Sequence, residues 1–516
     1  MILLLISLLL LAGVIFVEFN RKNNKTTKQP PKRNPWPKVP NVFIGIKLGS
    51  KANIADILEG WAKQYGQQGV FETRLLFQRF YVICSEKAIS QLEQKRPYVI
   101  TRRKNLVSAF NSIGANGLFS AEGDTWKKDR RIVAPSLNHK NVEKYVTKIQ
   151  LVAGRLVEKW SKVIDKDPDI QIAINDDIIL SAVDVISLVA FAKDLNTVTH
   201  GGGELSSVLA KLFEIMMIRT VMPIKYYKIP IIGQHLDGGK KLKKYVVDLM
   251  QNVVDDFKNN VSEDKSATFL GRMIEFNNKT GDDSMSMERF VGNLLTMFGA
   301  GSETTASTLT MCLYEIANDT TGLQNELYKE MSQMVSIVNA DLDAYFTCLP
   351  RLRSLVYEVL RLKGPTPIFG VENVEPVEIN GVTIPTGSYF MFLHKYITEV
   401  ESFDETTGKG TRRGLLNTPI HEFCARRCLK QDEDGQISFV KPTYGTGFRT
   451  FGSGLRICPG KELAEVEILV FLTFILREFE ISLSPNHPKI TMVTQLAQRA
   501  SEDICLIMKK RKTKDS

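Results

Sequence analysis

The longest pattern of apolar residues at helical spacing runs from about Met287 to Asn318. Ser286 precedes it as the predicted N-terminal cap, and Glu288 lies in the predicted first turn. The middle of this helix, residues 298–305, contains two glycines, each of which costs about 1 kcal/mol relative to alanine in a helix interior. A flat ligand pressed against the backbone would compensate for this cost. Thr304 can donate its hydroxyl hydrogen to a backbone carbonyl and open the helix locally, which leaves room for water.

Three shorter segments also show helical patterns. One begins at Gly123, one covers Leu352–Leu362, and one begins at Lys461. Strand patterns are shorter than these. Apolar and polar residues alternate over residues 377–385 on both sides of the turn-forming pair Asn380-Gly381, which predicts a β-hairpin.

The N-terminus of the chain is strongly apolar. Residues 2–17 carry no charge, and this length lies near the lower limit for a helix that spans a membrane. Basic residues follow the run and none precedes it, so the positive-inside rule predicts that the bulk of the protein lies in the cytosol. We interpret residues 1–20 as an uncleaved single-pass anchor, with a cleaved signal peptide as the alternative. Residues 21–40, which are basic and proline-rich, predict a stiff hinge.

The rest of the 516-residue chain shows no low-complexity linker and no repeat. This predicts one large catalytic domain over residues 41–510 and a basic tail over residues 511–516. The net charge is +10, but the basic residues do not alternate with aromatic residues as they would on a nucleic-acid-binding surface. This pattern excludes a nucleic-acid partner and favours an acidic protein or an anionic membrane surface as the partner. The seven cysteines are scattered and predict a reducing environment rather than a disulfide framework.

Cys458 differs from the other cysteines because its surroundings suit a thiolate. Gly452 and Gly454 let backbone N–H groups approach the sulfur, and Arg456 adds a cation suited to a carboxylate. The helix predicted from Lys461 places Cys458 at a helix N-terminus, where partial positive charge favours an anion. A buried structural cysteine in a glycine-rich turn is the alternative interpretation.

Residues 451–460, Phe-Gly-Ser-Gly-Leu-Arg-Ile-Cys-Pro-Gly, fill every fixed position of the haem-binding loop of the cytochromes P450. The chain resembles this family of haem-thiolate monooxygenases over about residues 35–510. The resemblance implies a mainly α fold with small β-sheets (α+β), arranged as a triangular helical prism around a buried haem. It implies haem b (iron protoporphyrin IX) as the cofactor, Cys458 thiolate as the axial ligand of the iron, and Phe451 beside the haem.

A second motif lies within the long predicted helix. Residues 300–305, Ala-Gly-Ser-Glu-Thr-Thr, resemble the oxygen-activating motif of the family. The resemblance implies that Glu303 and Thr304 order water and deliver protons, and that Ala300 and Gly301 lie against the haem. A tolerated kink in a structural helix is the alternative.

A third motif is the pair Glu358 and Arg361, three residues apart on one face of a predicted helix. An exposed pair of this kind would contribute less than about 1 kcal/mol. In the family, such a pair is a buried structural brace that an arginine from a later loop completes, and Arg427 occupies the matching position. Ala425 stands where the family usually has proline, so the rigidity of this loop is left open.

A fourth motif follows Gly123. Trp126 and Arg130 are four residues apart and can point the same way along a helix. The resemblance implies that both, together with Arg456, hydrogen-bond a haem propionate, since an indole N–H and a guanidinium are donors that suit a carboxylate. Members of the family often supply another arginine or histidine near the position of Val371, and this chain has neither there. The sequence does not show what replaces it.

The resemblance also implies a reaction and its partners. One oxygen atom from O2 would be inserted into a lipophilic small-molecule substrate. The chain has no flavin- or nicotinamide-binding stretch, and it resembles microsomal members that take electrons from NADPH-cytochrome P450 reductase, with cytochrome b5 as a second candidate donor. The implied location is the endoplasmic reticulum membrane, with the catalytic domain in the cytosol. A haem-thiolate isomerase or lyase acting on peroxides, or a non-catalytic haem sensor, are the alternatives.

Overall fold

The computed structural model divides the chain into two compact units, Met1–Trp36 and Pro37–Ser516. The predicted anchor, residues 1–20, and most of the predicted hinge lie outside the described residues. No helix among the described residues combines the length and the apolar character needed to cross a bilayer. The structure describes residues 35–41, 54–75, 78–221, 225–229, 238–259, 268–279, 285–334, 341–400, 417–442, 448–494 and 497–511.

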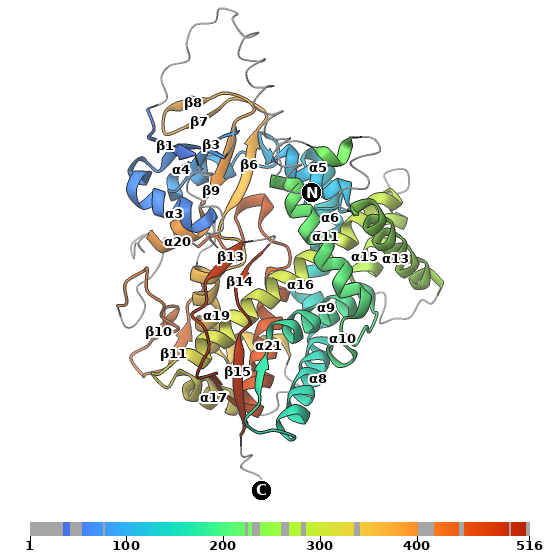
Figure 1. Cartoon of the computed structure of the whole chain (residues 1–516), viewed down its shortest axis with the longest axis vertical. Helices are drawn as coiled ribbons and strands as arrows, with labels where there is room; N and C mark the ends of the chain where they lie inside the picture. Colours follow the sequence, from blue (N-terminus) through green and yellow to red (C-terminus); the bar gives the residue numbers. More distant parts are fainter. Residues whose placement is uncertain are drawn as a thin grey trace, which may run out of the picture. The chain divides into compact units, whose positions relative to one another are not determined.

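Helices dominate the second unit (Figure 1). The α-helices are α3 Ile54–Tyr65, α4 Glu86–Glu93, α5 Lys104–Ser112, α6 Gly123–Val133, α7 His139–Glu143, α8 Val146–Ile164, α9 Asn175–Phe191, α10 Thr197–His200, α11 Gly203–Val221, α13 Gly239–Asn259, α15 Phe269–Lys279, α16 Met287–Asn318, α17 Leu323–Ser332, α18 Leu342–Thr347, α19 Pro350–Lys363, α20 His394–Val400 and α21 Lys461–Glu478. The short 3-10 helices are η1 Gly66–Gln68, η2 Ala134–Leu137, η3 Tyr226–Lys228 and η5 Gly454–Arg456.

The strands form small sheets. The largest is six-stranded, in the order β1-β2-β3-β9-β6-β4, and mixes parallel and antiparallel pairs. A three-stranded sheet has the order β12-β15-β5, and the pairs β7-β8, β10-β11 and β13-β14 are hairpin-like. The strands are β1 Lys38–Asn41, β2 Val70–Leu75, β3 Gln78–Ile83, β4 Ile100–Arg102, β5 Gln171–Ala173, β6 Phe369–Asn373, β7 Val377–Ile379, β8 Val382–Ile384, β9 Tyr389–Phe392, β10 Leu429–Gln431, β11 Ile437–Phe439, β12 Phe479–Leu483, β13 Met492–Thr494, β14 Gln498–Ala500 and β15 Cys505–Lys510.

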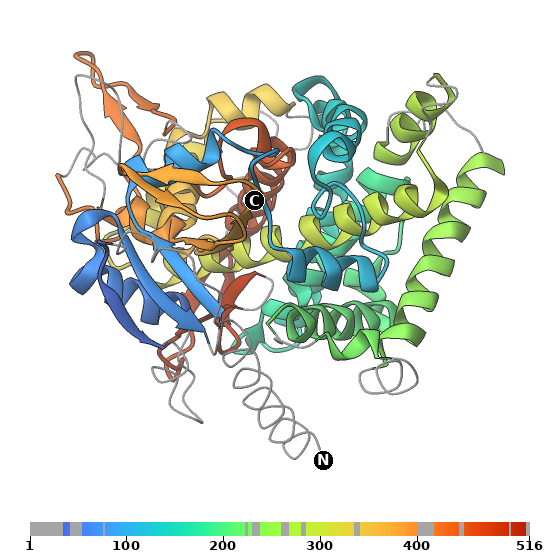
Figure 2. The same cartoon turned by 90° about the horizontal axis from the view of Figure 1, so that it is seen from above.

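The core of this unit forms around α16. This helix packs along α9 and also contacts α19 and α21, and α21 packs on α8. Most positions on α9 and α21 are buried on every side, as expected for helices at the centre of a large protein. In Figure 2 the blue and orange strands of the six-stranded sheet lie on one side of the unit, and the green helices lie on the other. The elements that carry the sequence motifs therefore meet in the interior.

The helices and the hairpin predicted from the sequence are confirmed. α16 covers Met287–Asn318, and the Ser286 hydroxyl caps it by accepting a hydrogen bond from the Arg289 N–H. The other three predicted helices are α6, α19 and α21. In the hairpin β7-β8, Asn380 and Gly381 have φ values of 49° and 78°, which is the left-handed backbone that a tight two-residue turn requires.

One local prediction is wrong. α16 is continuous through Thr304 rather than open at that residue. The Thr304 hydroxyl does donate to the Ala300 carbonyl, at 2.7 Å. A carbonyl oxygen has two lone pairs and can accept this bond as well as the bond from the helix backbone, so the threonine adds a contact without breaking the helix.

Candidate active site

Cys458 faces a cavity that α6, α16, α21 and the loop around residues 451–460 enclose. The side chain is accessible from this cavity, but the surrounding protein shields it from bulk solvent. Helix α21 begins three residues later, with Gly460 as its cap. The Cys458 N–H donates to the Phe451 carbonyl at 2.9 Å, which closes the loop on itself and holds the sulfur in position.

The environment of the Cys458 thiol includes opposing influences on its pKa. Burial raises the pKa of the thiol, while the Gly460 N–H and the positive charges of Arg130 and Lys461 lower it. Arg130 is held in place by a hydrogen bond of 2.9 Å from its Nη1 to the Ile457 carbonyl. A buried sulfur with these stabilising groups on the protein side and an open cavity on the other suits a thiolate that binds a metal from the cavity.

The glycines of this loop are required by its backbone. Gly452 and Gly454 have φ values of 71° and 60°, a conformation that is unfavourable for residues with a Cβ atom. A Cβ atom on Gly452 would lie no closer than 3.9 Å to the Arg456 carbonyl oxygen, and one on Gly454 would meet no protein atom within 4 Å. The conformation of the loop, rather than lack of space, therefore explains these two glycines.

The opposite wall of the cavity is the middle of α16. Ala300, Gly301, Thr304 and Thr305 line it, whereas Glu303 does not. Burial raises the pKa of Glu303, and the charge of Arg499 on β14 lowers it to a smaller extent. The structure therefore places Thr304 at the cavity and Glu303 on the adjacent side of the helix, toward the strand pair β13-β14.

Close packing against a neighbouring helix also requires a glycine at position 301. A Cβ atom there would lie 2.7 Å from Cδ1 of Ile186 on α9. The glycine thus allows α9 to approach α16 closely, which the sequence-based interpretation attributed to a flat ligand alone. Gly301 lines the cavity and also contacts a neighbouring helix.

Trp126, Arg130 and Arg456 all line the same cavity. The Arg456 guanidinium lies 4.6 Å from the centre of the Trp126 ring. It also donates to the Ala121 carbonyl at 2.6 Å and forms an ion pair with Glu122. The Arg456 Nε has no hydrogen-bond partner among the described residues. Burial is the main reason that the pKa of Arg456 falls to about 10, so a further anion beside it would be stabilising.

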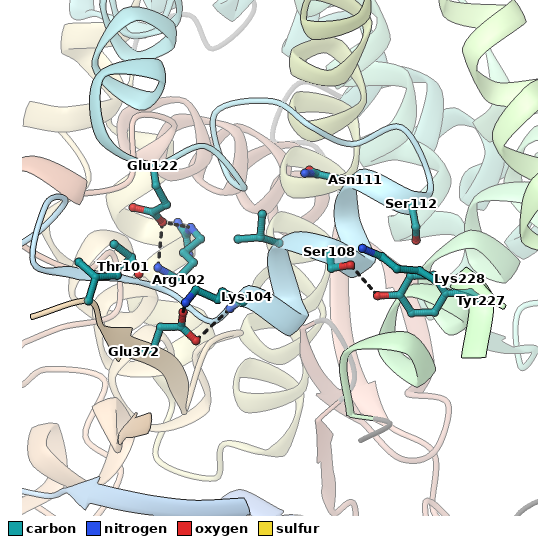
Figure 3. Close-up of a pocket in the computed structure, with 12 residues that line it drawn as sticks. Thr101, Arg102, Lys104, Ser108, Asn111, Ser112, Glu122, Tyr227, Lys228 and Glu372 are labelled. Atoms are coloured by element: carbon teal, nitrogen blue, oxygen red, sulfur yellow. Dashed lines mark hydrogen bonds and ion pairs between the residues drawn. The ribbon is translucent and has the colours of Figure 1, made fainter. Parts of the chain in front are cut away.

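Two arginines that the sequence-based interpretation did not include also line this cavity, Arg96 and Arg102. In each guanidinium, two nitrogen atoms have no hydrogen-bond partner among the described residues. Arg102 stacks on the ring of Phe119, with 3.8 Å between the guanidinium carbon and the ring centre, and lies beside Glu122 (Figure 3). Burial lowers the pKa of Arg102 well below its usual value, and the like charges of Arg96 and Arg456 lower it further. A carboxylate bound beside Arg102 would raise its pKa again, because a negative charge stabilises the protonated guanidinium.

His394 is the third residue that the sequence-based interpretation missed here. It begins α20, directly after strand β9, and stacks nearly parallel to Phe369, with ring centres 6.1 Å apart. Burial and the charges of Arg449 and Arg96 lower the pKa of His394 to about 3, so the imidazole is neutral. The Thr366 backbone opposes this shift slightly, but neither ring nitrogen has a partner at hydrogen-bonding geometry among the described residues.

These unpaired donors fit haem. Arg96, Arg102, Arg456 and His394 offer buried nitrogen donors that face one cavity, and unpaired buried donors of this kind carry a free-energy cost. The carboxylate of Glu93, which also lines the cavity, is already bound by Arg449 and Ser453. Haem supplies two carboxylates for these donors and a metal for the Cys458 sulfur. Arg96, Arg102 and the neutral His394 thus give this cavity further nitrogen donors, which the sequence lacks near Val371.

We expect Arg102→Leu to lose haem about tenfold faster than the wild type, since a hydrogen bond to a charged group is worth about 1.5–3 kcal/mol. The measurement is the rate of haem transfer from the purified holoprotein to excess apomyoglobin. Lys104→Leu is the matched control, because Lys104 pairs with Glu372 outside the haem cavity. Equal rates for Arg102→Leu and the wild type would show that Arg102 does not contact a propionate.

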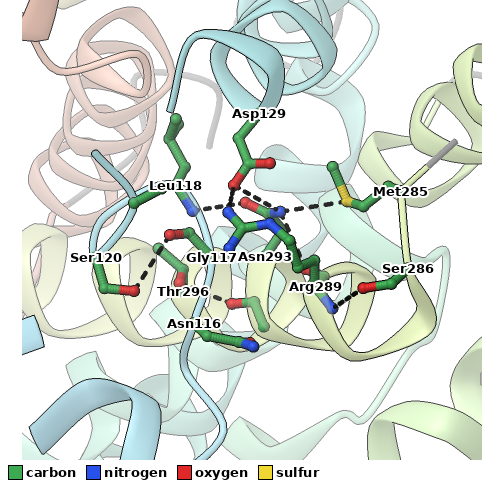
Figure 4. Close-up of polar contacts among 12 residues, drawn as sticks. Asn116, Gly117, Leu118, Ser120, Asp129, Met285, Ser286, Arg289, Asn293 and Thr296 are labelled. Atoms are coloured by element: carbon green, nitrogen blue, oxygen red, sulfur yellow. Dashed lines mark hydrogen bonds and ion pairs between the residues drawn. The ribbon is translucent and has the colours of Figure 1, made fainter. Parts of the chain in front are cut away.

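A polar cluster fixes the loop that leads into α6 (Figure 4). Asn293 on α16 accepts a hydrogen bond from the Leu118 N–H at 2.7 Å and donates to Asp129 on α6 at 3.3 Å. Asp129 also pairs with Arg289. A Cβ atom on Gly117 would lie 2.5 Å from a backbone carbonyl oxygen of α16, so the loop touches the helix directly. These contacts hold Leu118 and the helix that carries Trp126 and Arg130 against the cavity.

Glu358, Arg361 and Arg427 form a fully buried network. Arg361 donates to both carboxylate oxygens of Glu358, at 2.7 and 2.8 Å, and Arg427 Nε lies 3.1 Å from each. The Cys424 N–H also donates to Glu358, at 2.7 Å. These bonds, rather than the proline usual at the position of Ala425, hold the loop in place.

Arg449 is a further buried arginine that the sequence-based interpretation missed. Its side chain is 0% exposed and forms ion pairs with Glu86 and Glu93 at the two ends of α4. Its Nη1 also lies 3.3 Å from the Ser453 hydroxyl. Arg449 thereby ties the start of the cysteine loop to α4, some 360 residues earlier in the chain. No local pattern could have revealed this contact, because its partners are distant in sequence.

Residues 30–403 and 428–506 match the sequence model of the family described as Cytochrome P450. The chain belongs to the cytochrome P450 family. Cytochromes P450 are haem-binding oxidoreductases that incorporate oxygen from O2, and they act on lipophilic substrates with the help of redox partners. The family predicted from the sequence is confirmed.

Named relatives and solved structures agree with this membership. A probable cytochrome P450 513A1 of Dictyostelium discoideum is 22% identical, with 93% of each chain covered. Cytochrome P450 97B2, chloroplastic, of Glycine max is 24% identical over 79% of this chain and 75% of its own. The crystal structure of a cytochrome P450 (CYP102L1) has a TM-score of 0.74 at 18% identity and covers 94% of this chain and 100% of its own. The predicted fold class is thereby confirmed.

Proposed function

We propose that this cytochrome P450 is a membrane-anchored monooxygenase that oxidises a lipophilic substrate with electrons from NADPH-cytochrome P450 reductase. The observation that carries the proposal is one cavity with Cys458 on one wall, Thr304 on the opposite wall, and buried arginines with unpaired donors around it. Cytochrome b5 is a second candidate donor. We infer that the cofactor is haem b and that the Cys458 thiolate would bind its iron.

When haem is bound, its thiolate-ligated iron supplies the activation of O2. The residues of the chain then have distinct tasks. The Cys458 sulfur donates electron density, and the Gly460 N–H and Arg130 stabilise its negative charge. Arg96, Arg102, Arg456 and Trp126 orient the propionates and exclude other anions. Phe451 and Ala300 lie on the cavity wall, where they would contact the macrocycle.

Thr304 is the residue placed to move a proton. Its hydroxyl donates to the Ala300 carbonyl at 2.7 Å, which leaves its oxygen free to accept a hydrogen bond from water in the cavity. Glu303 is separated from the cavity but lies on the same turn of α16, with its pKa raised by burial. We infer that Glu303 resupplies protons to the Thr304 site through water, since a carboxyl group with a raised pKa exchanges protons more readily near neutral pH.

We expect Thr304→Ala to keep haem and to lose coupling. Consumption of NADPH should continue, product formed per NADPH should fall several-fold, and hydrogen peroxide should rise in proportion, because protons are no longer directed to the site of O2 activation. The measurement is product, NADPH and peroxide in one reconstituted assay. The control is Ser302→Ala, whose hydroxyl makes the same type of bond, to the Phe298 carbonyl at 2.9 Å, outside the cavity. Unchanged coupling in Thr304→Ala would remove Thr304 from the proton path.

The location rests on the N-terminal sequence. The apolar residues 2–17 and the basic residues that follow support an endoplasmic reticulum anchor with a cytosolic catalytic domain. The relatives include a sterol 26-hydroxylase named mitochondrial and two proteins named chloroplastic, so an organellar location is the competing proposal.

The surface of α6 suits docking of an acidic redox partner. Lys127 and Arg131 are exposed on this helix, and their positive charges would attract acidic side chains of the partner. The same helix carries Trp126 and Arg130, which line the haem cavity.

We expect deletion of residues 1–20 to release the protein from membranes while leaving the haem spectrum unchanged. The deleted segment precedes every residue that lines the haem cavity. The measurement is the fraction of protein in the supernatant after membranes are washed with salt and sedimented. Retention of the truncated protein would point to a second membrane contact, and secretion of a shortened wild-type chain would establish the signal-peptide alternative.

One assay separates the proposed reaction from its alternatives. The purified holoprotein is incubated with reductase, NADPH and a panel of lipophilic compounds, and in parallel with organic peroxides alone. Substrate-dependent NADPH consumption with an oxygenated product supports the monooxygenase. Rearrangement of peroxides without NADPH would identify an isomerase or lyase, and the absence of both would leave a haem sensor.

A further inference from the structure

A second cavity lies beside the haem cavity, between β4, α5, β6 and η3. Its volume is about 640 Å³, which is within the range of roughly 300–1,000 Å³ typical of small-molecule sites. Arg102 lines both cavities.

The charges at one end of this cavity are already compensated (Figure 3). Glu122 accepts from the Arg102 N–H at 2.9 Å and pairs with Arg456. Glu372 accepts from the Lys104 N–H at 3.1 Å, and its carboxylate lies 3.7 Å from the Lys104 ammonium. Both carboxylates therefore have partners, and neither is available to bind a cation.

The other end contains a positive charge without a partner. Lys228, on η3, makes no ion pair with any residue that the structure describes. Figure 3 shows it beside Tyr227 and Ser108, whose hydroxyl oxygens lie 2.9 Å apart. Asn111 and Ser112 of α5 complete this end. The Tyr227 hydroxyl donates to Ser108 and the Ser112 hydroxyl donates to the Ala109 carbonyl. The Lys228 ammonium, the Ser108 hydroxyl and the Asn111 amide therefore remain as donors at this end.

This arrangement favours a ligand with one negative charge. Among the residues that line the cavity the two ion pairs cancel, and Lys228 leaves a net charge of +1. The Arg219 guanidinium lies behind this end, where it donates to the Ser112 hydroxyl at 2.7 Å and lies 4.8 Å from the centre of the Tyr227 ring. A carboxylate brings one negative charge to Lys228, whereas a phosphate group brings up to two. Val107 and Val374 also line the cavity, and an alkyl chain can pack on these side chains.

We propose that this second cavity binds the carboxylate head of an amphiphilic substrate, with Lys228 as the cationic partner of the carboxylate and with Ser108, oriented by Tyr227, as a hydrogen-bond donor. The apolar chain of the substrate runs past Arg102 into the haem cavity. This inference deepens the proposed monooxygenase function and rests on it. It assigns the substrate class as long-chain carboxylic acids, and it makes Lys228 a residue that determines specificity.

The experiment compares two probes of equal chain length, dodecanoate and dodecan-1-ol, in equilibrium dialysis against the full-length holoprotein. We expect Lys228→Glu to weaken dodecanoate binding about tenfold or more, since a close charge pair becomes a repulsion, and to change dodecan-1-ol binding less than about twofold. We expect Tyr227→Phe to weaken dodecanoate binding by a few fold. Lys225→Glu is the matched control: it makes the same charge change in the same segment, but Lys225 does not line the cavity.

Three results would overturn the proposal. They are no saturable binding of dodecanoate by the wild type, an equal loss for both probes in Lys228→Glu, and an equal loss of dodecanoate binding in Lys225→Glu. The haem spectrum and the NADPH consumption with a substrate that lacks a carboxylate are measured on the same preparations. Because dialysis does not depend on turnover, selective carboxylate binding by a protein that oxidises nothing would overturn the monooxygenase proposal separately.

Discussion

We expect Cys458→Ala to abolish the red-shifted Soret band that a reduced, CO-bound protein shows when a thiolate ligates the haem. Alanine cannot supply a negatively charged ligand, and the described residues that line the cavity include no second cysteine; Met297, which does line it, carries only a neutral thioether. Haem content should fall several-fold, because the metal–sulfur bond is lost while the contacts to the propionates remain. The measurement is the CO difference spectrum of the purified protein, normalised to protein concentration.

Cys428→Ala is the control for this substitution. Cys428 is also buried but lies outside the haem cavity, so its variant should keep the band at normal intensity. A retained thiolate band in Cys458→Ala would contradict the assignment of the axial ligand. Loss of the band in both variants would indicate general unfolding, and thermal unfolding curves of the two proteins would detect it.

The second large effect is expected at the buried brace. Arg361→Ala leaves Glu358 inside the protein with one of its two arginine partners removed, and breaking a buried ion pair costs about 3–5 kcal/mol. Folded domains are stable by only about 5–15 kcal/mol, so little folded, haem-containing protein should remain at growth temperature. Glu358→Ala should behave in the same way, since it removes the acceptor for both Arg361 and Arg427.

Arg426→Ala is the matched control for the buried network of Glu358, Arg361 and Arg427. Arg426 is the sequence neighbour of Arg427 and also forms an ion pair, with Glu326, but both of those side chains are partly exposed to solvent. An exposed pair contributes about 0–1 kcal/mol, so this variant should retain normal haem content. The free energy of unfolding in denaturant checks both variants. Similar values for Arg361→Ala and Arg426→Ala would show that burial does not make the brace different.

Local sequence patterns determined much of this protein. The limits of α16, the start of α21 after Cys458 and the hairpin at Asn380-Gly381 followed from capping, periodicity and turn chemistry. Each of these depends on residues close together in the chain. The haem loop belongs to the same group, because its left-handed glycines and its cysteine lie within a few residues of one another. Short motifs therefore predicted the family and the fold, which are confirmed, and they point to Cys458 as the candidate ligand of the iron.

The tertiary structure alone decided which buried nitrogen donors surround the haem cavity. Arg96 and Arg102 lie close together in the sequence, but His394 comes from a segment almost 300 residues later, and no sequence motif connects them. The tertiary structure also decided that Thr304 lines the cavity and that Glu303 does not, because helix packing sets the rotation of α16 about its own axis. The reason is physical: charge compensation in a protein interior depends on distance in space, and residues that are remote in sequence become neighbours only when the chain has folded.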